Sequence, residues 1–239
     1  MGNYTLILPQ AIPIADAARD PRGNGIGTLS IKPNGKVHWE GTLPDGTKVV
    51  QNDRLAKDNT WPLFLRLYNK KGVLLGIATV DALQAHSDLS GAFDWFKPVI
   101  EKDFYFPMGF RILDSDLIGS FYSPPTPGTR ALTGFNDVAN NGRVTLQEGS
   151  MLADIVRTVT YDSKNRVTIS NPGVDGLAIT IDKATGLFSG SFIHPVSEKL
   201  TPIEGVLFQK QKIGAGRFQG SSVVGVNPQT GRVLFESAP

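Results

Sequence analysis

The chain has 239 residues, of which 40% are hydrophobic and 19% are charged, and its 24 basic and 22 acidic residues leave a formal net charge of +2. This composition is typical of a globular protein, and the scattered Lys and Arg residues do not form the basic stripe of a nucleic-acid-binding surface. The absence of Cys excludes disulfides, thiolate metal sites and cysteine nucleophiles. The apolar runs are shorter than the roughly 18–20 residues of a membrane-spanning helix, so we expect no span.

Residues that break helices occur along the whole chain. Its 26 Gly and 16 Pro residues interrupt nearly every window of helical length, so we predict an all-β fold with less than about 15% helix. Only the stretches 81–90 and 149–159 could form a short helix. Strand-like runs rich in β-branched and aromatic residues follow one another in chain order at 27–31, 36–43, 62–68, 73–80, 143–146, 166–170, 177–181, 186–192, 203–209, 217–224 and 232–235. This spacing is typical of an antiparallel barrel or sandwich.

The segments between these runs have the chemistry of tight turns. Asn-Gly or Asp-Gly pairs stand at 34–35, 45–46 and 141–142, and such pairs tolerate the positive φ angles that hairpins need. Residues 1–9 begin with a strand-like run and lack the basic and cleavage features of a signal peptide. We expect any targeting segment to lie outside this sequence.

A Pro-rich segment at 123–129 divides the chain almost in half. Three Pro residues in seven positions exclude it from the interior of a sheet, so it predicts a linker. The N-terminal β half would then span 1–122 and the C-terminal β half 130–239. Residues 29–43 resemble 179–192, and residues 67–72 resemble 207–214. We therefore predict two related meander halves, packed together as one unit.

Several Gly-rich and aromatic motifs together resemble a known family. They are GIGTLSI at 25–31, GTLPDGT at 41–47, WPLF at 61–64, TGLFSGSF at 185–192 and GVLFQK at 205–210. The set, within a match from about Tyr4 to Val233, is similar to a C-terminal β-rich module of large exported or surface proteins of planctomycete and verrucomicrobial bacteria, a family of unassigned function. The resemblance implies β structure and an extracellular or cell-surface location. It transfers no catalytic residue.

Motifs for catalysis and for cofactors are weak. Ser189 and Ser191 lie near His194, with Asp182 and Glu198 close in sequence, but no Gly-x-Ser-x-Gly elbow surrounds either serine. A packing role for these serines is therefore the favoured interpretation. The three His residues (His38, His86 and His194) show no metal-binding spacing, and the Gly-rich pieces lead into no helix. We expect no metal and no cofactor.

The strongest candidates for ligand binding lie between residues 94 and 105. Trp95, Phe104 and Tyr105 are accompanied by Asp94 and Asp103. Sugars stack on aromatic rings and form hydrogen bonds with carboxylates, so this segment predicts a carbohydrate-facing surface with at least two exposed, roughly coplanar rings. The alternative is that these rings fill the core, where large aromatic side chains are commonly buried.

Two functions remain open from the sequence. The first is a non-catalytic binding or structural module of an exported bacterial protein, with a polysaccharide, a small ligand or neighbouring domains as its partner. The second is a hydrolase of esters or glycosides, with an unrecognised site in a barrel mouth or in a groove between the halves. Carboxylate pairs for glycoside hydrolysis depend on spacing in the fold and cannot be identified from sequence.

Overall fold

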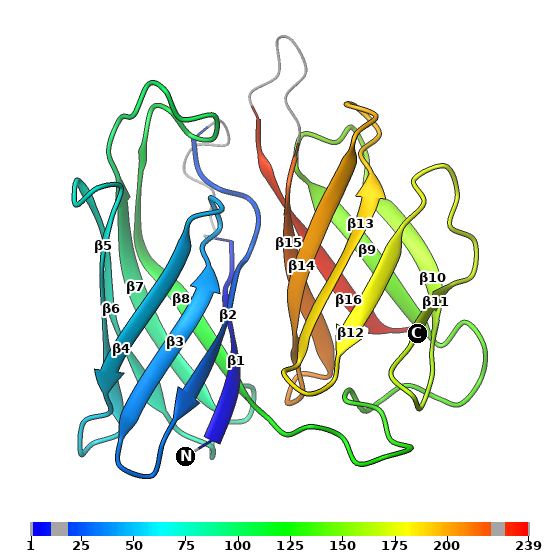
Figure 1. The fold of residues 1–239 in the computed structure, drawn as a ribbon, viewed down its shortest axis with the longest axis horizontal. Helices are drawn as coiled ribbons and strands as arrows, with labels where there is room; N and C mark the ends of the chain where they lie inside the picture. Colours follow the sequence, from blue (N-terminus) through cyan, green and yellow to red (C-terminus); the bar gives the residue numbers. More distant parts are fainter. Residues whose placement is uncertain (1, 11–18, 221–227, 239) are drawn as a thin grey trace.

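The computed structural model describes residues 2–10, 19–220 and 228–238, and these residues form sixteen strands and no helix. The prediction of an all-β fold is confirmed for this part of the chain (Figure 1). Residues 81–90 and 149–159 hold turns that lead into strands, so neither forms a helix. No described segment is a helix long and apolar enough to cross a membrane.

The first eight strands form one barrel-like sheet. They are β1 (Gly2–Leu8), β2 (Gly25–Ile31), β3 (Lys36–Thr42), β4 (Lys48–Arg54), β5 (Thr60–Leu67), β6 (Gly72–Val80), β7 (Leu89–Lys97) and β8 (Phe110–Tyr122). The order across the sheet is β4-β3-β2-β1-β8-β7-β6-β5, with antiparallel pairing throughout. Because β1 pairs with β8, the meander closes on itself except between β4 and β5.

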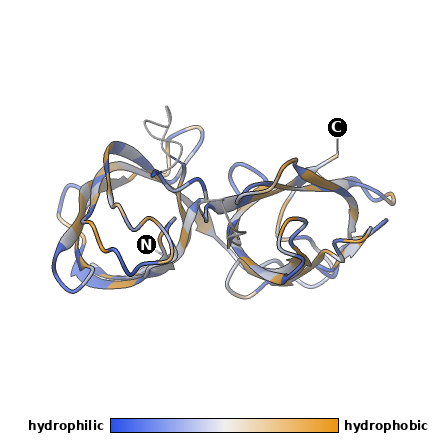
Figure 2. Ribbon diagram, turned by 90° about the horizontal axis from the view of Figure 1, so that it is seen from above, coloured by the Kyte–Doolittle hydropathy of each residue, from blue (hydrophilic) through white to orange (hydrophobic). Residues whose placement is uncertain are grey.

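The last eight strands form a second barrel of the same kind. They are β9 (Gly142–Glu148), β10 (Ile155–Tyr161), β11 (Val167–Ile169), β12 (Ala178–Asp182), β13 (Leu187–Ile193), β14 (Leu200–Phe208), β15 (Ile213–Gln219) and β16 (Thr230–Ser237). Their order is β11-β10-β9-β16-β15-β14-β13-β12, so the opening lies between β11 and β12. Figure 2 shows the two rings side by side, viewed from above.

The alternation of side chains along each strand explains why the sheets curl around a core. In β5, buried and exposed residues alternate from Trp61 to Leu67, because successive side chains of a strand point to opposite faces. The inward positions of β5 hold large apolar residues (Trp61, Leu63, Leu65 and Leu67), whereas its outward positions hold Pro62, Phe64 and Arg66. Each sheet therefore buries one face by closing into a barrel.

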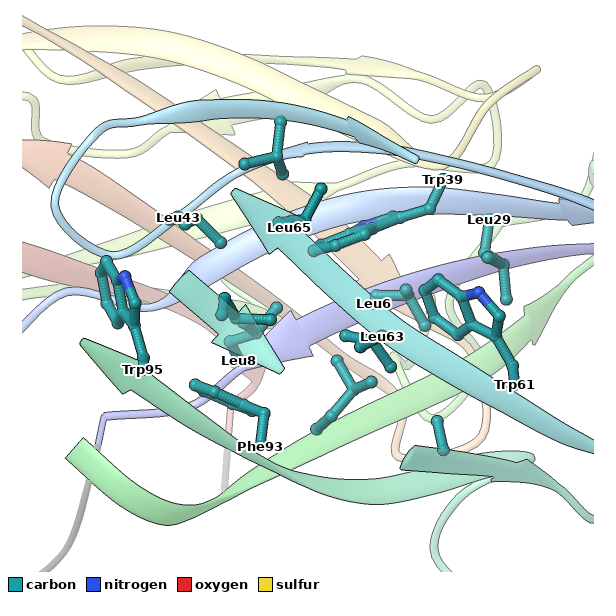
Figure 3. Packing of buried hydrophobic residues seen from close by; sticks show 14 of the residues in the cluster. Leu6, Leu8, Leu29, Trp39, Leu43, Trp61, Leu63, Leu65, Phe93 and Trp95 are labelled. Atoms are coloured by element: carbon teal, nitrogen blue, oxygen red, sulfur yellow. The ribbon is translucent and has the colours of Figure 1, made fainter. Parts of the chain in front are cut away.

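Aromatic side chains fill both barrels, but the largest buried rings are tryptophans in the first barrel and phenylalanines with a tyrosine in the second. Trp39, Trp61 and Trp95 are fully buried in the first barrel (Figure 3). The second barrel has Tyr161, Phe192, Phe218 and Phe235 at comparable depth. Glycines make room for some of these rings: a Cβ added to Gly205 would lie 2.1 Å from the ring of Phe188. The interiors are packed cores built from different aromatic residues.

The sequence similarity between the two halves aligns strands that occupy different positions in their barrels. It aligns β2 with β12 and β3 with β13, yet β2 is the second strand of its barrel and β12 is the fourth of the other. The two halves are similar, but this register of the repeat is wrong, because hairpins with similar turns recur at several places in a meander.

The ends of the two barrels are covered by different segments. The loop between β7 and β8 lies at one end of the first barrel and contributes Phe106 to its core. The segment between β8 and β9 contributes Ala131, Leu132 and Phe135 to the core of the second barrel. The first sheet therefore ends at Tyr122, and residues soon after 130 already belong to the second core.

The barrels contact each other along their sides. Buried apolar residues form the centre of this contact: Ile7, Ile26, Val206, Phe208 and Ala215. At one end, the Lys210 ammonium donates hydrogen bonds to the carbonyls of Ala82 and Ser87, both at 3.0 Å, and pairs with Asp88 at 2.9 Å. At the other end, Arg22 pairs with Glu148 at 2.6 Å. Apolar contact with polar clamps at both ends fixes one barrel against the other.

Candidate functional site

Trp95, the leading ligand-binding candidate from the sequence, lies inside the first barrel. Only 1% of its surface is exposed, and its ring packs edge-on against Phe110 with 4.5 Å between the ring centroids. An enclosed ring cannot stack on a ligand, so the prediction is wrong for this residue. Its neighbour Asp94 points outward and accepts a hydrogen bond from the Asp114 backbone N–H at 2.9 Å, beside an irregularity in the β7–β8 pairing.

Asp103, Phe104 and Tyr105 lie together in the loop between β7 and β8. Phe104 is 57% exposed, but Tyr105 is half-buried and donates a hydrogen bond from its hydroxyl to the Gly220 carbonyl. Burial raises the pKa of Tyr105. The planes of the two rings meet at 83°. The prediction of a flat strip with two coplanar exposed rings is therefore wrong.

Phe104 does line a small hollow at this end of the barrel. Its volume is about 180 Å³, and its other lining residues are Arg19, Phe106, Pro107, Met108, Gly109 and Pro228. Asp94, Asp103 and the Trp95 ring do not line this hollow. The candidates from the sequence therefore do not converge on one cavity.

Asp103, in the loop between β7 and β8, belongs to a buried polar network. The Lys97 ammonium lies 2.6 Å from the Asp103 carboxylate and 3.6 Å from that of Asp45. The Tyr68 hydroxyl donates a hydrogen bond to Asp45 at 2.7 Å, and burial together with the Asp45 charge raises the Tyr68 pKa. Since a buried ammonium needs such partners, Asp103 has a structural role in neutralising Lys97.

A larger feature lies between the two barrels. Three hollows of about 300, 370 and 260 Å³ follow one another there. The first shares Ile26, Leu187 and Glu204 with the second, and Thr28 and Glu40 with the third. Because they share these residues, we treat them as one depression, named here the inter-barrel groove. Residues of β2, β3 and β4 line one side of it, and residues of β12, β13 and β14 line the other.

The inter-barrel groove has an apolar floor and polar walls. Ile26 and Leu187 belong to the apolar contact between the barrels and form part of the floor. Outward positions of the flanking strands supply the walls, where hydroxyl, carboxylate and ammonium groups are provided by Thr28, Glu40, Thr42 and Lys48 of the first barrel and by Thr180, Asp182, Ser189 and Glu204 of the second. Concave sites with apolar surface and a few polar groups are typical of ligand binding.

Neighbouring groups hold two carboxylates of the groove in place. Glu204 accepts a hydrogen bond at 2.7 Å from the buried guanidinium of Arg217, whose Nε and Nη2 atoms have no hydrogen-bond partner among the described residues. Asp182 accepts hydrogen bonds from the Thr185 hydroxyl at 2.7 Å and from the Ala184 N–H at 2.9 Å, and these bonds lower its pKa. Asp182 is therefore ionised near neutral pH.

The weak Ser–His candidate does not form a catalytic pair. Ser189 lines the groove, whereas His194 is completely buried inside the second barrel. The His194 Nε2 lies 2.9 Å from the Gly149 carbonyl, and its Nδ1 accepts from the N–H of Val196, so the ring has structural partners on both sides. Within the described residues, no three His, Asp or Glu side chains are placed to hold a metal ion.

The sequence suggested a groove between the halves as one possible place for a site, but it did not identify the residues that line it, because the walls come from distant segments. The motif runs at 25–31 and 185–192 do contain Thr28 and Ser189. The pattern of those runs shows that alternate residues share a face. It does not show which outward residues of one barrel face the other barrel.

No family model and no curated protein matches this chain. Among solved structures, intact Ap-TbpB with its N and C lobes is similar, with 11% sequence identity and a TM-score of 0.29. The similarity covers 90% of this chain and 55% of that one, so the chain spans about half the length of that protein. A likeness this weak carries no argument about fold or function.

Proposed function

We propose that this chain is a non-catalytic binding module, that its ligand site is the inter-barrel groove, and that it belongs to an exported or surface protein. The observation that carries the proposal is a continuous groove of three hollows with an apolar floor and polar walls. The location rests on the sequence resemblance to exported modules alone.

The lining of the groove favours a ligand rich in hydroxyl groups, such as a polysaccharide or a small sugar. The Thr28, Thr180 and Ser189 hydroxyls donate and accept hydrogen bonds, and the carboxylates of Glu40 and Asp182 accept them. The apolar surface of Ile26 and Leu187 suits the C–H face of a sugar ring. An elongated groove of joined hollows fits several units of a chain better than one compact molecule.

One observation favours the alternative of a glycoside hydrolase. Glu40 and Glu204 line the same hollow, and glycosidases use a pair of carboxyl groups. One member of such a pair must donate a proton to the leaving group. Glu204 is already the acceptor of the Arg217 guanidinium, so Glu40 would have to be the donor. The Glu40 side chain is 62% exposed, unlike the apolar surroundings of a general acid. This arrangement supports binding over hydrolysis.

A panel of soluble polysaccharides in affinity gel electrophoresis tests the proposal. We expect at least one to retard the full chain, and Ser189→Trp to abolish that retardation by filling the groove. Thr158→Trp is the matched control, because Thr158 is an exposed residue on β10, outside the groove. Loss of retardation in both variants, or in neither, would contradict the groove as the site.

The same samples distinguish binding from hydrolysis. Release of reducing ends by the unaltered chain, together with its loss in Glu40→Gln and Glu204→Gln, would identify a glycosidase and overturn the non-catalytic proposal. We expect no release of reducing ends, and we expect polysaccharide retardation to persist in Glu204→Gln.

A further inference from the structure

One lysine and two aspartates meet at the end of the first barrel, where the turn between β3 and β4 lies beside the loop between β7 and β8 (Figure 1). The Lys97 Nζ atom lies 2.6 Å from Asp103 Oδ2 and 3.6 Å from Asp45 Oδ2. Only 5% of the Lys97 side chain and 1% of the Asp45 side chain are exposed. An amine and a carboxyl group are thus held close together and away from water, and this proximity favours a reaction between them.

The surroundings of these groups are largely aromatic. The Lys97 Nζ atom lies 4.6 Å from the centre of the Tyr68 ring. Tyr68 packs against the core of the first barrel, to which Trp95 and Phe106 belong. Such surroundings penalise an ammonium and a carboxylate far more than they penalise a neutral amide. Burial therefore favours a form in which the two charges have been lost by joining the side chains.

Hydrogen-bond donors are directed at both oxygens of the Asp45 carboxyl group. Its Oδ1 atom accepts from the Thr47 N–H at 2.9 Å. Its Oδ2 atom accepts from the Tyr68 hydroxyl at 2.7 Å and from the Thr47 hydroxyl at 3.0 Å. Donors in these positions stabilise the negative charge that develops on the oxygens when a nucleophile attacks the carboxyl carbon. Asp45 therefore has the environment of an electrophile.

Asp103 is placed to move protons. Its Oδ2 atom accepts a hydrogen bond from the Lys97 ammonium at 2.6 Å, within the reach that a general base needs. The Asp103 side chain is 36% exposed, in contrast to the enclosed Asp45. Asp103 can therefore take a proton from Lys97 at a point where water can leave. The two aspartates differ in surroundings and are suited to different roles.

We propose that Lys97 and Asp45 form an amide bond between their side chains, an isopeptide bond, with Asp103 as the acid–base group. The Lys97 ammonium gives a proton to Asp103, and the neutral amine attacks the Asp45 Cγ atom. The N–C bond forms and one C–O bond breaks. The departing oxygen leaves as water with two protons, both of which come from the ammonium and pass through Asp103. One ammonium and one carboxylate become one amide and one water, so no oxidant or co-reactant is needed.

The bond joins two parts of the barrel that are far apart in the sheet. Asp45 lies in the turn that follows β3 and Lys97 ends β7, and β2, β1 and β8 separate these strands. The chain has no Cys, so a disulfide cannot supply such a link. A covalent cross-link stabilises a fold by restricting its unfolded chain. Neither Lys97 nor Asp45 lines the inter-barrel groove, so the proposal is independent of the ligand.

Mass spectrometry of the unaltered, denatured chain tests the proposal. We expect an intact mass about 18 Da below that of the sequence, which is the loss of one water. In a proteolytic digest, the peptides that contain Lys97 and Asp45 should appear as one joined species. The ion pair of Lys210 with Asp88 is the control within the same digest. It has a distance of 2.9 Å, but no second carboxylate pairs with Lys210 among the described residues, so we expect its peptides to remain separate.

Three variants assign the roles. Lys97→Met and Asp45→Ala each remove one bonding group and are expected to have the full mass of their sequences. Asp103→Asn keeps both bonding groups but removes the base. After the same incubation, we expect its joined fraction to be lower by at least about tenfold. Melting curves show which variants are folded, and the mass of the unaltered chain tests the bond without any variant.

Several results would overturn the proposal. One is a full intact mass for the unaltered chain. Another is a loss of water confined to the peptide that holds Asp45 and Gly46, because this result indicates a cyclic imide and no cross-link. A bond from Lys97 to Asp103 would contradict the assignment of Asp45 as the electrophile. An unchanged joined fraction in Asp103→Asn would contradict the acid–base role of Asp103.

Discussion

The two barrels share one topology but differ in what fills and surrounds it. Each is a meander of eight antiparallel strands whose first and last strands pair. Tryptophans occupy the first interior, and phenylalanines with a tyrosine occupy the second. The first barrel has an apolar outer face and the second does not. Alternation and pairing therefore determine the barrel, while the outward residues remain available for binding.

The barrels also close differently. In the first, the Gln51 side chain spans the opening between β4 and β5: its amide donates to the Pro62 carbonyl at 2.7 Å and accepts from the Phe64 N–H at 3.1 Å. A side-chain amide thus takes the place of a backbone peptide group. In the second, a single bridge between Arg166 and Thr180 joins the two sides of the opening. Closure is local, and each barrel achieves it by its own means.

The largest expected effect comes from truncating a core ring in either barrel. We expect Trp95→Ala and Phe192→Ala each to lower the free energy of unfolding by about 3–5 kcal/mol through the cavity left behind. Because the barrels are clamped together, both variants are expected to shift one shared transition in a thermal melt. Two separate transitions, with only one moved by each substitution, would contradict the single unit.

Removing a clamp between the barrels is expected to have a smaller effect. Lys210→Met removes the ammonium that donates to two carbonyls and to Asp88 Oδ1, which is expected to cost about 1–3 kcal/mol. Calorimetry of this variant should show a broadened or split transition. Lys164→Met, on an exposed turn, is the control and should melt as the unaltered chain does. Equal behaviour of the two variants would show that Lys210 does not couple the barrels.

Opening the first barrel tests the role of Gln51. Gln51→Met keeps the length of the side chain but loses both hydrogen bonds across the β4–β5 opening. We expect a loss of about 1–3 kcal/mol in denaturant unfolding and faster amide exchange at Phe64. Asn52→Ala, at the exposed neighbouring position, is expected to change stability by less than about 0.5 kcal/mol. Unchanged exchange at Phe64 would refute the bridging role.

Alkaline pH is expected to affect both barrels. Burial raises the pKa of Tyr68 in the first barrel, where the Asp45 charge adds to it, and burial raises the pKa of Tyr161 in the second. Each folded-state pKa exceeds the unfolded value near 10. The stability that the two protonated hydroxyls contribute is therefore complete below about pH 10 and is lost as the pH rises above it. Tyr68→Phe and Tyr161→Phe should each flatten the alkaline decline in melting temperature. An unchanged decline in both would contradict this account.

The smallest effect is expected in acid. Hydrogen bonds from Thr185 and Ala184 lower the pKa of Asp182 below its ordinary value of 3.8. The stability that these bonds provide is present above that value and is lost as the pH falls through the lower folded-state pKa. Asp182→Asn should therefore reduce the dependence of the melting temperature on pH below about 4. The control is Asp137→Asn, at an exposed position. The same acid dependence in both would show that Asp182 contributes nothing.

The sequence was sufficient to predict the fold class, because alternation in runs such as 36–43 and turn pairs such as Asn34-Gly35 are local features. It could not place Trp95, since burial depends on which alternate face the closed sheet turns inward. It also misplaced the repeat, because β2 and β12 have similar hairpins at different positions in their barrels. The lining of the groove escaped prediction, since Thr28 and Ser189 come to line adjoining hollows only when the barrels pack.

The most direct test of the groove as the binding site is methyl NMR of the full chain, titrated with the polysaccharide that the gel assay selects. Ile26 reports on the groove floor, and Met108 reports on the small hollow beside Phe104. We expect the Ile26 methyl signals to shift in a saturable way while the Met108 signal stays unchanged. A saturable shift at Met108 with none at Ile26 would place the ligand at the end of the first barrel and contradict the groove.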